Sequence, residues 1–527
     1  MSVRASRYAS IQKLNNERLR IIGMKTPAAL LLALTSSAPL SALADNLHRP
    51  ARRAPELPTS ERAEVETLLD RELQQAVESE PLLPGQKKVV ITTTLNPGNR
   101  EMLIDLGRDA VPATAGAASE RQCHFLMTEA ISILKDAVRI DGYTCTYGGN
   151  DIFYYHPDLP ATTPAADTTK EERQDGPPVV VMVSAGHGYF YNGVSRQWET
   201  RRPLMNGMRE DFVTPYFARD VAADLINKSH MSVAKARTNE ATIHAPSNQP
   251  WWRMSARTWL ESQYPDNPEI WNSLNNDNDP DGQEDDDIRA RPLFANHVNA
   301  SYSLHIHTNG STNTSIRGTL GFYQRDRQDD ARFVARILCS MKETIQAHPF
   351  YRNWSVDLQP RYGNYGELRL TDPSKRAALI EVGFHSNAQD ATALKSEAFR
   401  TAAAAGMAKG IRLYHEGKNC ETFKIDSIPD VIGSVNTPFS YLISYSGNPT
   451  YPVKVYSQPV SCPSGWSCSR FHRTVNSPTR SPITQEINCS SNNVGQSGTF
   501  RYKRWLVDAD GVSTAPFEQT YTCNAAM

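Results

Sequence analysis

One stretch decides the fold of this chain: Val179-Val180-Val181-Met182-Val183-Ser184-Ala185-Gly186-His187-Gly188. It begins as an apolar run, which is typical of a buried strand, and it ends with a histidine between two glycines. Two later stretches share this design. Ser301–Ile306 leads directly into His307, and the apolar run Ala377–Val382 is interrupted by Glu381. Because functional groups gather at the strand ends of a single sheet, we expect these three side chains to meet.

Strands and helices alternate over residues 179–418. Besides the three strands, the periodicity predicts helices over Phe212–Ile226, Asp329–Ile345 and Asp390–His415. The alternation predicts an α/β domain with a mixed sheet that is covered by helices on both faces. After Cys420 short segments alternate in polarity, so residues 421–527 are expected to form a small all-β, sandwich-like domain with disulfides.

The first 44 residues have the pattern of a secretory signal. Met24-Lys25 precedes the apolar run Ala28–Leu34, and Ala42-Leu43-Ala44 offers a cleavage site. The apolar run is too short to span a bilayer, so we expect an exported protein, periplasmic or secreted, without a membrane span. Behind the signal we predict a mostly loose leader at 45–115 with a helix near Ser60–Val77, a small helical segment at 116–160 and a linker at 161–178.

Charge and cysteine content narrow the class further. The chain has 56 Lys+Arg and 57 Asp+Glu, a net charge of −1, so nothing global favours a nucleic-acid partner. The eight cysteines favour disulfides in an oxidising compartment. The sequence does not fix their pairing, and the pairs that we favour are Cys123–Cys145, Cys462–Cys468, Cys489–Cys523 and the remaining Cys339–Cys420.

The candidate chemistry lies on the later strands. His305 and His307 are two residues apart, so on a strand they point to the same face and both can reach one metal ion. Alternatively, they are two solvated histidines on an exposed strand face. Glu381 lies within a buried strand, where an acid must be paired, bound to a metal or catalytic.

These residues, taken in order, resemble the zinc-dependent N-acetylmuramoyl-L-alanine amidases, which cut peptidoglycan between its glycan and its stem peptide. The resemblance covers roughly Val179–His415. It is carried by these elements: Gly186-His187-Gly188, Gly207-Met208-Arg209-Glu210, Arg291–Asn296, His307-Thr308-Asn309 and Glu381–Asn387. The chain departs from the family pattern beside His187, where Ser184 and Tyr189 replace an Asp and a Gly.

The resemblance implies a mechanism and a set of ligands. His187, Glu210 and His307 would hold one Zn²⁺, and Glu381 would act as the general base toward a metal-activated water. Glu199 is the rival of Glu210, because its spacing from His187 is closer to that of the family. Supporting roles around the ligands are implied for His305, Asn309 and Arg291.

An acidic insertion at 258–288 stands apart from this pattern. Its run Asp277–Asp287 resembles the start of a calcium loop, but Ile288 occupies the place of the bidentate Glu. The alternatives are a Ca²⁺ site and a solvated acidic loop.

Three functions fit these observations. The first is an exported zinc amidase that acts on peptidoglycan. The second is a zinc exopeptidase that acts on peptides, and the third is a non-catalytic protein that binds the cell wall. In each case the C-terminal β domain is a candidate for binding an activator or a wall component.

Overall fold

The computed structural model describes residues 59–96, 100–134, 138–157, 159, 179–274, 276–277, 282–476, 481–490 and 495–525. The predicted signal at 1–44 and the linker at 161–178 lie outside the described residues. In the described part, each helix is either too short or too polar to cross a lipid bilayer.

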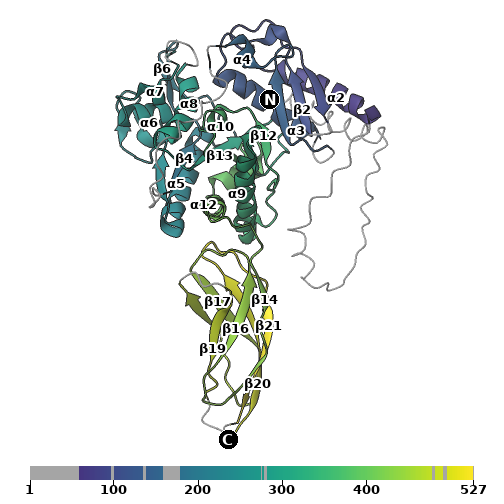
Figure 1. Ribbon diagram of the computed structural model, residues 1–527, viewed down its shortest axis with the longest axis vertical. Coiled ribbons are helices and arrows are strands. Elements are labelled where there is room, and N and C mark those ends of the chain that lie inside the picture. Colours follow the sequence, from purple (N-terminus) through teal and green to yellow (C-terminus); the bar gives the residue numbers. More distant parts are fainter. Residues whose placement is uncertain are drawn as a thin grey trace. The chain divides into compact units, whose positions relative to one another are not determined.

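A nine-stranded mixed sheet organises the first part of the molecule (Figure 1). Its strand order is β1-β2-β3-β12-β11-β13-β10-β4-β7. The strands are β1 (Thr92–Asn96), β2 (Glu101–Asp105), β3 (Gly142–Thr146), β4 (Val180–Ala185), β7 (Ser232–Lys235), β10 (Tyr302–Asn309), β11 (Leu320–Gln324), β12 (Arg361–Gly363) and β13 (Arg376–Phe384). Strands β13, β10, β4 and β7 are parallel, and β11 runs antiparallel to β13. The predicted mixed sheet is confirmed.

Helices cover both faces of this sheet. On one face, Val181, Ile306 and Ile380 pack in a single core with α5 (Glu210–Ser229), α9 (Gln328–Ala347) and α12 (Glu397–His415). The opposite face is covered by α2 (Thr59–Val77) and α3 (Ala117–Leu134) at one end. It is covered by α6 (Ala256–Gln263) and α8 (Gly282–His297) at the other end. The shorter helices are α4 (Ile152–Tyr155), α7 (Pro268–Trp271), α10 (Gly366–Arg369) and α11 (Ala388–Lys395).

The prediction of a loose leader at 45–115 is wrong for the described part of that range, whereas the helix predicted near Ser60–Val77 is confirmed as α2. Helix α2 buries Leu69 and Leu73 completely, and β1 and β2 extend the main sheet. Strand β1 reads Thr-Thr-Thr-Leu-Asn and turns Thr93 and Leu95 inward. Strands of five residues carry too little apolar periodicity to stand out in a polar stretch. Likewise the segment 116–160 is not purely helical, because it contributes β3 to the same sheet.

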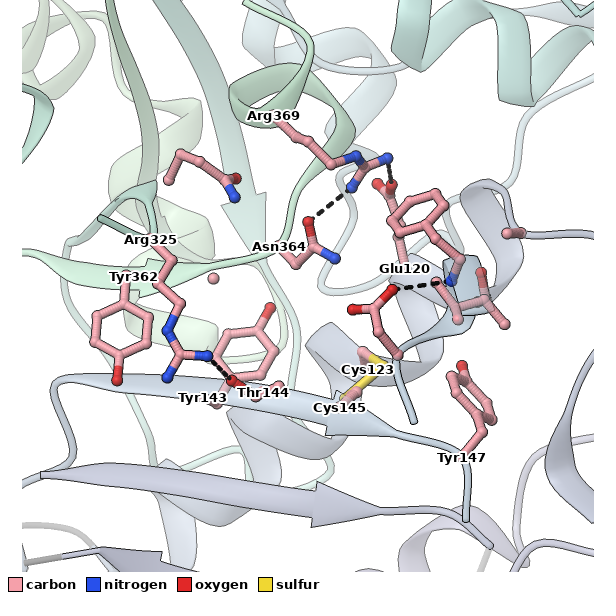
Figure 2. A pocket seen from close by; sticks show the side chains of 17 residues that line it. Glu120, Cys123, Tyr143, Thr144, Cys145, Tyr147, Arg325, Tyr362, Asn364 and Arg369 are labelled. Carbon is pink, nitrogen blue, oxygen red and sulfur yellow. Dashed lines mark hydrogen bonds and ion pairs between the residues drawn. A yellow bond between two sulfur atoms is a disulfide. The ribbon is translucent and has the colours of Figure 1, made fainter. Parts of the chain in front are cut away.

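Two short β-hairpins lie in the loops that connect the elements of the main sheet. They are β5 (Phe190–Asn192) with β6 (Gln197–Glu199), and β8 (Ile243–His244) with β9 (Gln249–Pro250). A cavity of about 250 Å³ lies beside β3, β11 and β12, on the face that α3 covers (Figure 2).

The C-terminal part consists of strands only within its described residues. Its two sheets have the orders β14-β16-β19 and β15-β21-β20-β17-β18. Ile443 and Ile483 of the first sheet share one core with Val455 and Phe500 of the second, as in a sandwich. The strands are β14 (Lys424–Ser427), β15 (Val431–Ser434), β16 (Phe439–Ser446), β17 (Val453–Ser461), β18 (Phe471–Val475), β19 (Ile483–Ile487), β20 (Gly498–Val507) and β21 (Phe517–Asn524).

The cysteines pair as favoured from the sequence. The disulfides are Cys123–Cys145, Cys339–Cys420, Cys462–Cys468 and Cys489–Cys523. The first joins α3 to β3, so it fixes a helix onto the sheet that it covers.

Candidate metal centre

His187 lies in a tight turn just after β4. Its φ of 54° is in the left-handed region, and Gly188 follows with a φ of 131°. A non-glycine residue with positive φ is strained and usually has a functional reason. Gly186 has a packing reason of its own, because a Cβ there would lie 2.5 Å from the Nδ1 of His307. The Gly-His-Gly sequence therefore lets the chain pass directly beside His307.

Glu210 is the first residue of α5, and its side chain is buried. Its Oε1 accepts a hydrogen bond from the backbone N–H of Thr308 at 3.0 Å. A carboxylate at a helix N-terminus is also stabilised by the helix dipole. The helix and the backbone of β10 together hold this carboxylate toward the sheet.

His307 and Glu381 lie opposite each other on neighbouring parallel strands. The register of β10 and β13 pairs His307 with Glu381, and both side chains are buried. Adjacent strands of a sheet are about 4.8 Å apart, so this pairing places a histidine and an acid within reach of one small group.

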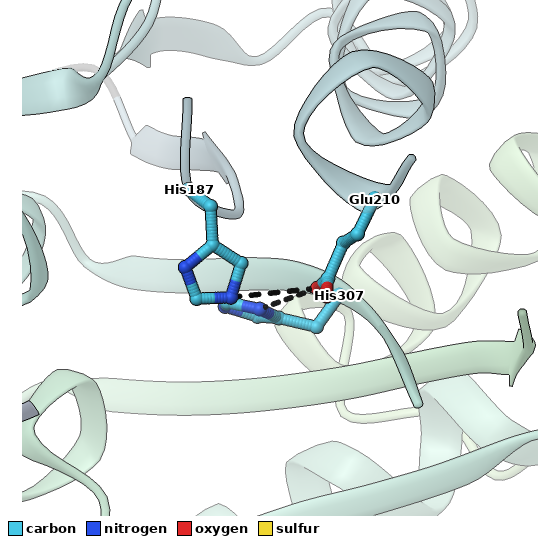
Figure 3. A group of neighbouring side chains, drawn as sticks. All are labelled: His187, Glu210 and His307. Carbon is cyan, nitrogen blue, oxygen red and sulfur yellow. Dashed lines mark hydrogen bonds and ion pairs between the residues drawn. The ribbon is translucent and has the colours of Figure 1, made fainter. Parts of the chain in front are cut away.

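His187, Glu210 and His307 form one cluster of buried metal-ligating side chains (Figure 3). One donor atom from each lies within 4.8 Å of the others. The Nδ1 of His307 is 3.0 Å from Glu210 Oε1, and the Nε2 of His187 is 3.6 Å from the same oxygen. Figure 3 shows all three side chains pointing toward a common centre from a turn, a helix and a strand.

The donor set fits a zinc ion. Two imidazoles and one carboxylate are a common ligand set of catalytic zinc sites, which leave the fourth position open. Ligands about 2.0–2.2 Å from one ion lie at most about 4.4 Å apart, close to the spacing seen here. The three side chains could therefore hold Zn²⁺ after small adjustments.

Two charged residues that the sequence did not single out contact this cluster. Arg202 Nη2 lies 2.8 Å from His187 Nε2, and its Nε lies 3.2 Å from Glu210 Oε2. Glu367 of α10 lies 2.8 Å from His307 Nε2 through its Oε1. Their sequence surroundings gave no signal, because Arg202 lies in a loop and Glu367 in a helix of four residues.

These charges set the electrostatics of the cluster. Burial opposes a proton on His307, but Glu367 and Glu210 outweigh it and raise the pKa of His307 to about 10. Burial likewise raises the pKa of Glu210, yet its hydrogen bond with His307 and the charge of Arg202 lower it to about 2. Burial and Arg202 hold the pKa of His187 well below its usual range. The carboxylate is therefore ionised at neutral pH, as a metal ligand must be.

Glu381 is buried, and one of its two carboxylate oxygens has no hydrogen-bond partner among the described residues. Burial raises its pKa to about 8, and Glu210 adds to the effect while His307 opposes it. Its Oε1 lies 3.5 Å from the Nε2 of His124 on α3. Its Oε2 is buried and has no hydrogen-bond partner among the described residues. A buried carboxylate oxygen without a partner is costly unless it serves a reaction or a ligand.

His124 is a third residue that the sequence did not single out. Its Nδ1 lies 2.6 Å from the hydroxyl of Tyr365, and its Nε2 lies 3.2 Å from Asn309 Oδ1. Burial lowers the pKa of His124 to about 4, and Arg202 adds to this. A neutral histidine thus joins α3 to the candidate base.

The remaining predicted residues lie behind the cluster. His305 is fully buried, and its Nδ1 lies 4.0 Å from Glu367 Oε1. Arg291 is fully buried between Asp287 and Glu367, and it forms an ion pair with each. Glu199 lies on the hairpin strand β6, and the cluster found among the described residues contains Glu210 instead.

The described part of the acidic insertion is not a solvated loop. Glu284, Asp285, Asp286 and Asp287 are buried in α8 rather than solvated. Each is bound by protein groups, so none of them joins a candidate metal cluster within the described residues. Residues 278–281 of the predicted calcium loop lie outside the described part.

Comparison with known proteins identifies this domain. Residues 181–413 match the N-acetylmuramoyl-L-alanine amidase family. A germination-specific N-acetylmuramoyl-L-alanine amidase of Bacillus subtilis (strain 168) is 27% identical over 133 residues. That match covers 25% of this chain and 52% of the relative, so the chain spans about half the length of the relative.

Solved structures of the family are also similar to this chain. The catalytic domain of CwlV, an N-acetylmuramoyl-L-alanine amidase from Bacillus (Paenibacillus) polymyxa var. colistinus, is 22% identical, with a TM-score of 0.29. The match covers 46% of this chain and 99% of that domain. The CwlD amidase from Clostridioides difficile, solved in complex with the GerS lipoprotein, is 17% identical with a TM-score of 0.32. This second match covers 46% of this chain and 100% of CwlD. Residues 181–413 of this chain therefore form a region that matches the N-acetylmuramoyl-L-alanine amidase family.

Proposed function

We propose that this protein hydrolyses the amide bond between N-acetylmuramic acid and L-alanine in peptidoglycan, with one zinc ion as cofactor. The observation that carries the proposal is the convergence of His187, Glu210 and His307 within 4.8 Å. Glu381 lies opposite His307 on the next strand, where a general base is needed. The family match of residues 181–413 supports the choice of an amidase over an exopeptidase.

His187, Glu210 and His307 would hold the metal. A zinc ion bound there would supply a Lewis acid that polarises the scissile carbonyl and lowers the pKa of a water. The chain's own contribution begins with Glu381, whose Oε2 is free to accept a proton from the attacking water. The same oxygen then returns that proton to the leaving amine of L-alanine, so the carboxylate ends as it began.

The surroundings of Glu381 suit this proton transfer. A pKa raised to about 8 by burial keeps the carboxyl able both to bind and to release a proton near neutral pH. His124 Nε2 lies 3.5 Å from Oε1, whereas Oε2 has no hydrogen-bond partner among the described residues. Burial of the centre excludes bulk water and strengthens each electrostatic contact.

The test compares the release of stem peptide from purified sacculi by the wild type and by Glu381→Gln. We expect activity to fall about 10²–10⁴-fold in the variant, because the base is lost while the shape is kept. Zinc content, measured by atomic emission, should stay at one ion per chain. Exposed Glu240→Gln is the matched control and should behave as wild type. Unchanged activity in Glu381→Gln would refute the role of the base, and chelator-insensitive activity would refute the metal.

We also propose that the protein is exported, to the periplasm or beyond the cell. Four disulfides within the described residues support an oxidising compartment. The C-terminal sandwich is a candidate for binding an activator or a wall component. Fractionation of cells that express the full chain tests the location.

A further inference from the structure

The cavity beside β3, β11 and β12 is a second candidate site, separate from the metal cluster (Figure 2). Its volume is about 250 Å³, close to the lower end of pockets that hold small molecules. Much of its lining comes from the segment between Ala115 and Phe153, which precedes the residues that match the amidase family. The cavity is thus an addition of this chain to the amidase domain.

The charged groups in the lining already have protein partners. Arg369 pairs with Glu120 at 2.8 Å, and Arg325 forms an ion pair with Glu101. Asp151 accepts a hydrogen bond from the backbone N–H of Phe153. Because both arginines of the lining are already ion-paired, neither is left to neutralise a phosphate or a carboxylate. A neutral ligand suits it better than an ion.

Three polar atoms of lining residues lack partners among the described residues. They are the hydroxyl of Tyr147, the Nε–H of Arg369 and the Oε1 of Gln324. Tyr147 is only 1% exposed and Arg369 only 8%, so bulk water does not replace the missing bonds. Buried polar groups are rarely left unpaired, so these three indicate a ligand that both donates and accepts hydrogen bonds.

Aromatic rings form the rest of the walls. Tyr143, Tyr147, Phe153 and Tyr362 line the cavity, and aromatic faces pack well against the C–H faces of a sugar ring. An acetamido group offers an N–H for Gln324 and a C=O for Arg369. We propose that this cavity binds one neutral, N-acetylated sugar residue of a glycan strand. The choice of glycan rests on the proposed function, because peptidoglycan strands carry such sugars.

The cavity is connected to the candidate active site through α10. Arg369 of this helix lines the cavity, whereas Glu367, two residues earlier, contacts His307. A second connection runs through aromatic rings. Tyr143 of the cavity contacts Tyr365 at 6.3 Å between ring centroids, and the Tyr365 hydroxyl reaches His124. A sugar bound here would anchor a glycan strand beside the residues that cut its stem peptide.

The test is a calorimetric titration of the full chain with the trimer of N-acetylglucosamine. The trimer contains no stem peptide, so binding can be measured without turnover. We expect saturable binding, and Tyr147→Phe should weaken it about fivefold by removing one hydrogen bond. Tyr441→Phe is the matched control, because it removes another buried, unpaired hydroxyl from the C-terminal sandwich. This control should bind as wild type, and thermal unfolding should show that both variants fold.

The outcomes separate this proposal from the proposed function. Equal binding of cellotriose, which has no acetamido group, would overturn the assignment, as would unchanged affinity in Tyr147→Phe. Competition by a free stem peptide would reassign the cavity to a peptide. A chain that releases stem peptide from sacculi but ignores the trimer refutes the cavity proposal alone. A chain that binds the trimer without cutting sacculi refutes the amidase proposal alone.

Discussion

The metal cluster and the acidic stretch of α8 are both rich in buried ionisable groups, yet only one has the geometry of a cation site. In the cluster, donor atoms of His187, Glu210 and His307 converge within 4.8 Å. In α8, four consecutive acids at 284–287 are each no more than 4% exposed, but their oxygens point to separate partners. The number of carboxylates is therefore a poor guide to metal binding, and the convergence of ligand atoms on one point is a better guide.

The partners in α8 show how the acids are used instead. Glu284 forms ion pairs with Arg121 and Arg201. Asp285 accepts from the N–H of Ala117, and Asp286 accepts from the N–H of Leu274. Glu284 and Asp285 both tie α8 to α3, and Asp286 ties it to the segment that follows α7. These acids bind α8 to neighbouring parts of the domain, whereas the ligand atoms of the cluster face one another.

The largest expected effect contrasts one acid from each region. Glu210→Gln should lower zinc content and amidase activity by at least about a hundredfold, because it removes a charged ligand. Asp286→Asn should keep both, since its partners are a hydroxyl and a backbone N–H of the protein. The measurements are metal analysis after dialysis and stem-peptide release. Loss of zinc from Asp286→Asn would contradict this difference between the cluster and α8.

A smaller effect, on the free energy of unfolding, is expected from substitution of Arg291, which connects α8 to the cluster. Arg291 is fully buried and pairs with both Asp287 and Glu367. Arg291→Leu leaves two buried carboxylates uncompensated, so the free energy of unfolding should fall by about 3–5 kcal/mol. Arg289→Leu on the same helix loses a hydrogen bond to Ser273 and should cost about 1 kcal/mol. Urea denaturation of the full chain measures both, and equal losses would show that burial of the pair is unimportant.

The acidic stretch should also give stability a pH dependence. Burial raises the pKa of Asp285 from its ordinary value of 3.8 to about 7, and Glu284 adds to this. The folded state thus holds the proton more tightly than the unfolded state. This contribution is fully present below about pH 4 and is lost as the pH rises through about 7. Asp285→Asn should remove a decline of about 2–4 kcal/mol between pH 4 and pH 8.

The control for this pH series is Asp266→Asn, which removes an exposed carboxylate from the loop before α7. Its unfolding free energy should follow the wild-type pH curve. If Asp285→Asn keeps the wild-type slope, the carboxyl is not the group that titrates.

The sequence predicted the sheet and the order of its functional side chains, because apolar runs of five or six residues mark buried strands well. It also predicted that Glu381 lies in one sheet with His187 and His307, whereas the register that pairs Glu381 with His307 comes from the structure. It predicted a helix near Ser60–Val77, where α2 lies, but it missed β1 and β2, because strands of five residues give too short a pattern in a polar stretch. Arg202, Glu367 and His124 were missed for a similar reason. Each lies in a loop, a short helix or a remote segment, and only tertiary contacts bring it to the cluster.

The smallest expected effect concerns His124, which lies between the cavity and the cluster. Nε2 of this neutral ring lies beside two oxygens, Asn309 Oδ1 and Glu381 Oε1, so we assign the proton to Nε2, and Nδ1 then accepts from the Tyr365 hydroxyl. Tyr365→Phe removes that donor and lets the ring change tautomer, which loosens Glu381. We expect kcat to fall about two- to tenfold with little change in KM, because ground-state binding does not use this contact. A change confined to KM would instead assign Tyr365 to substrate binding.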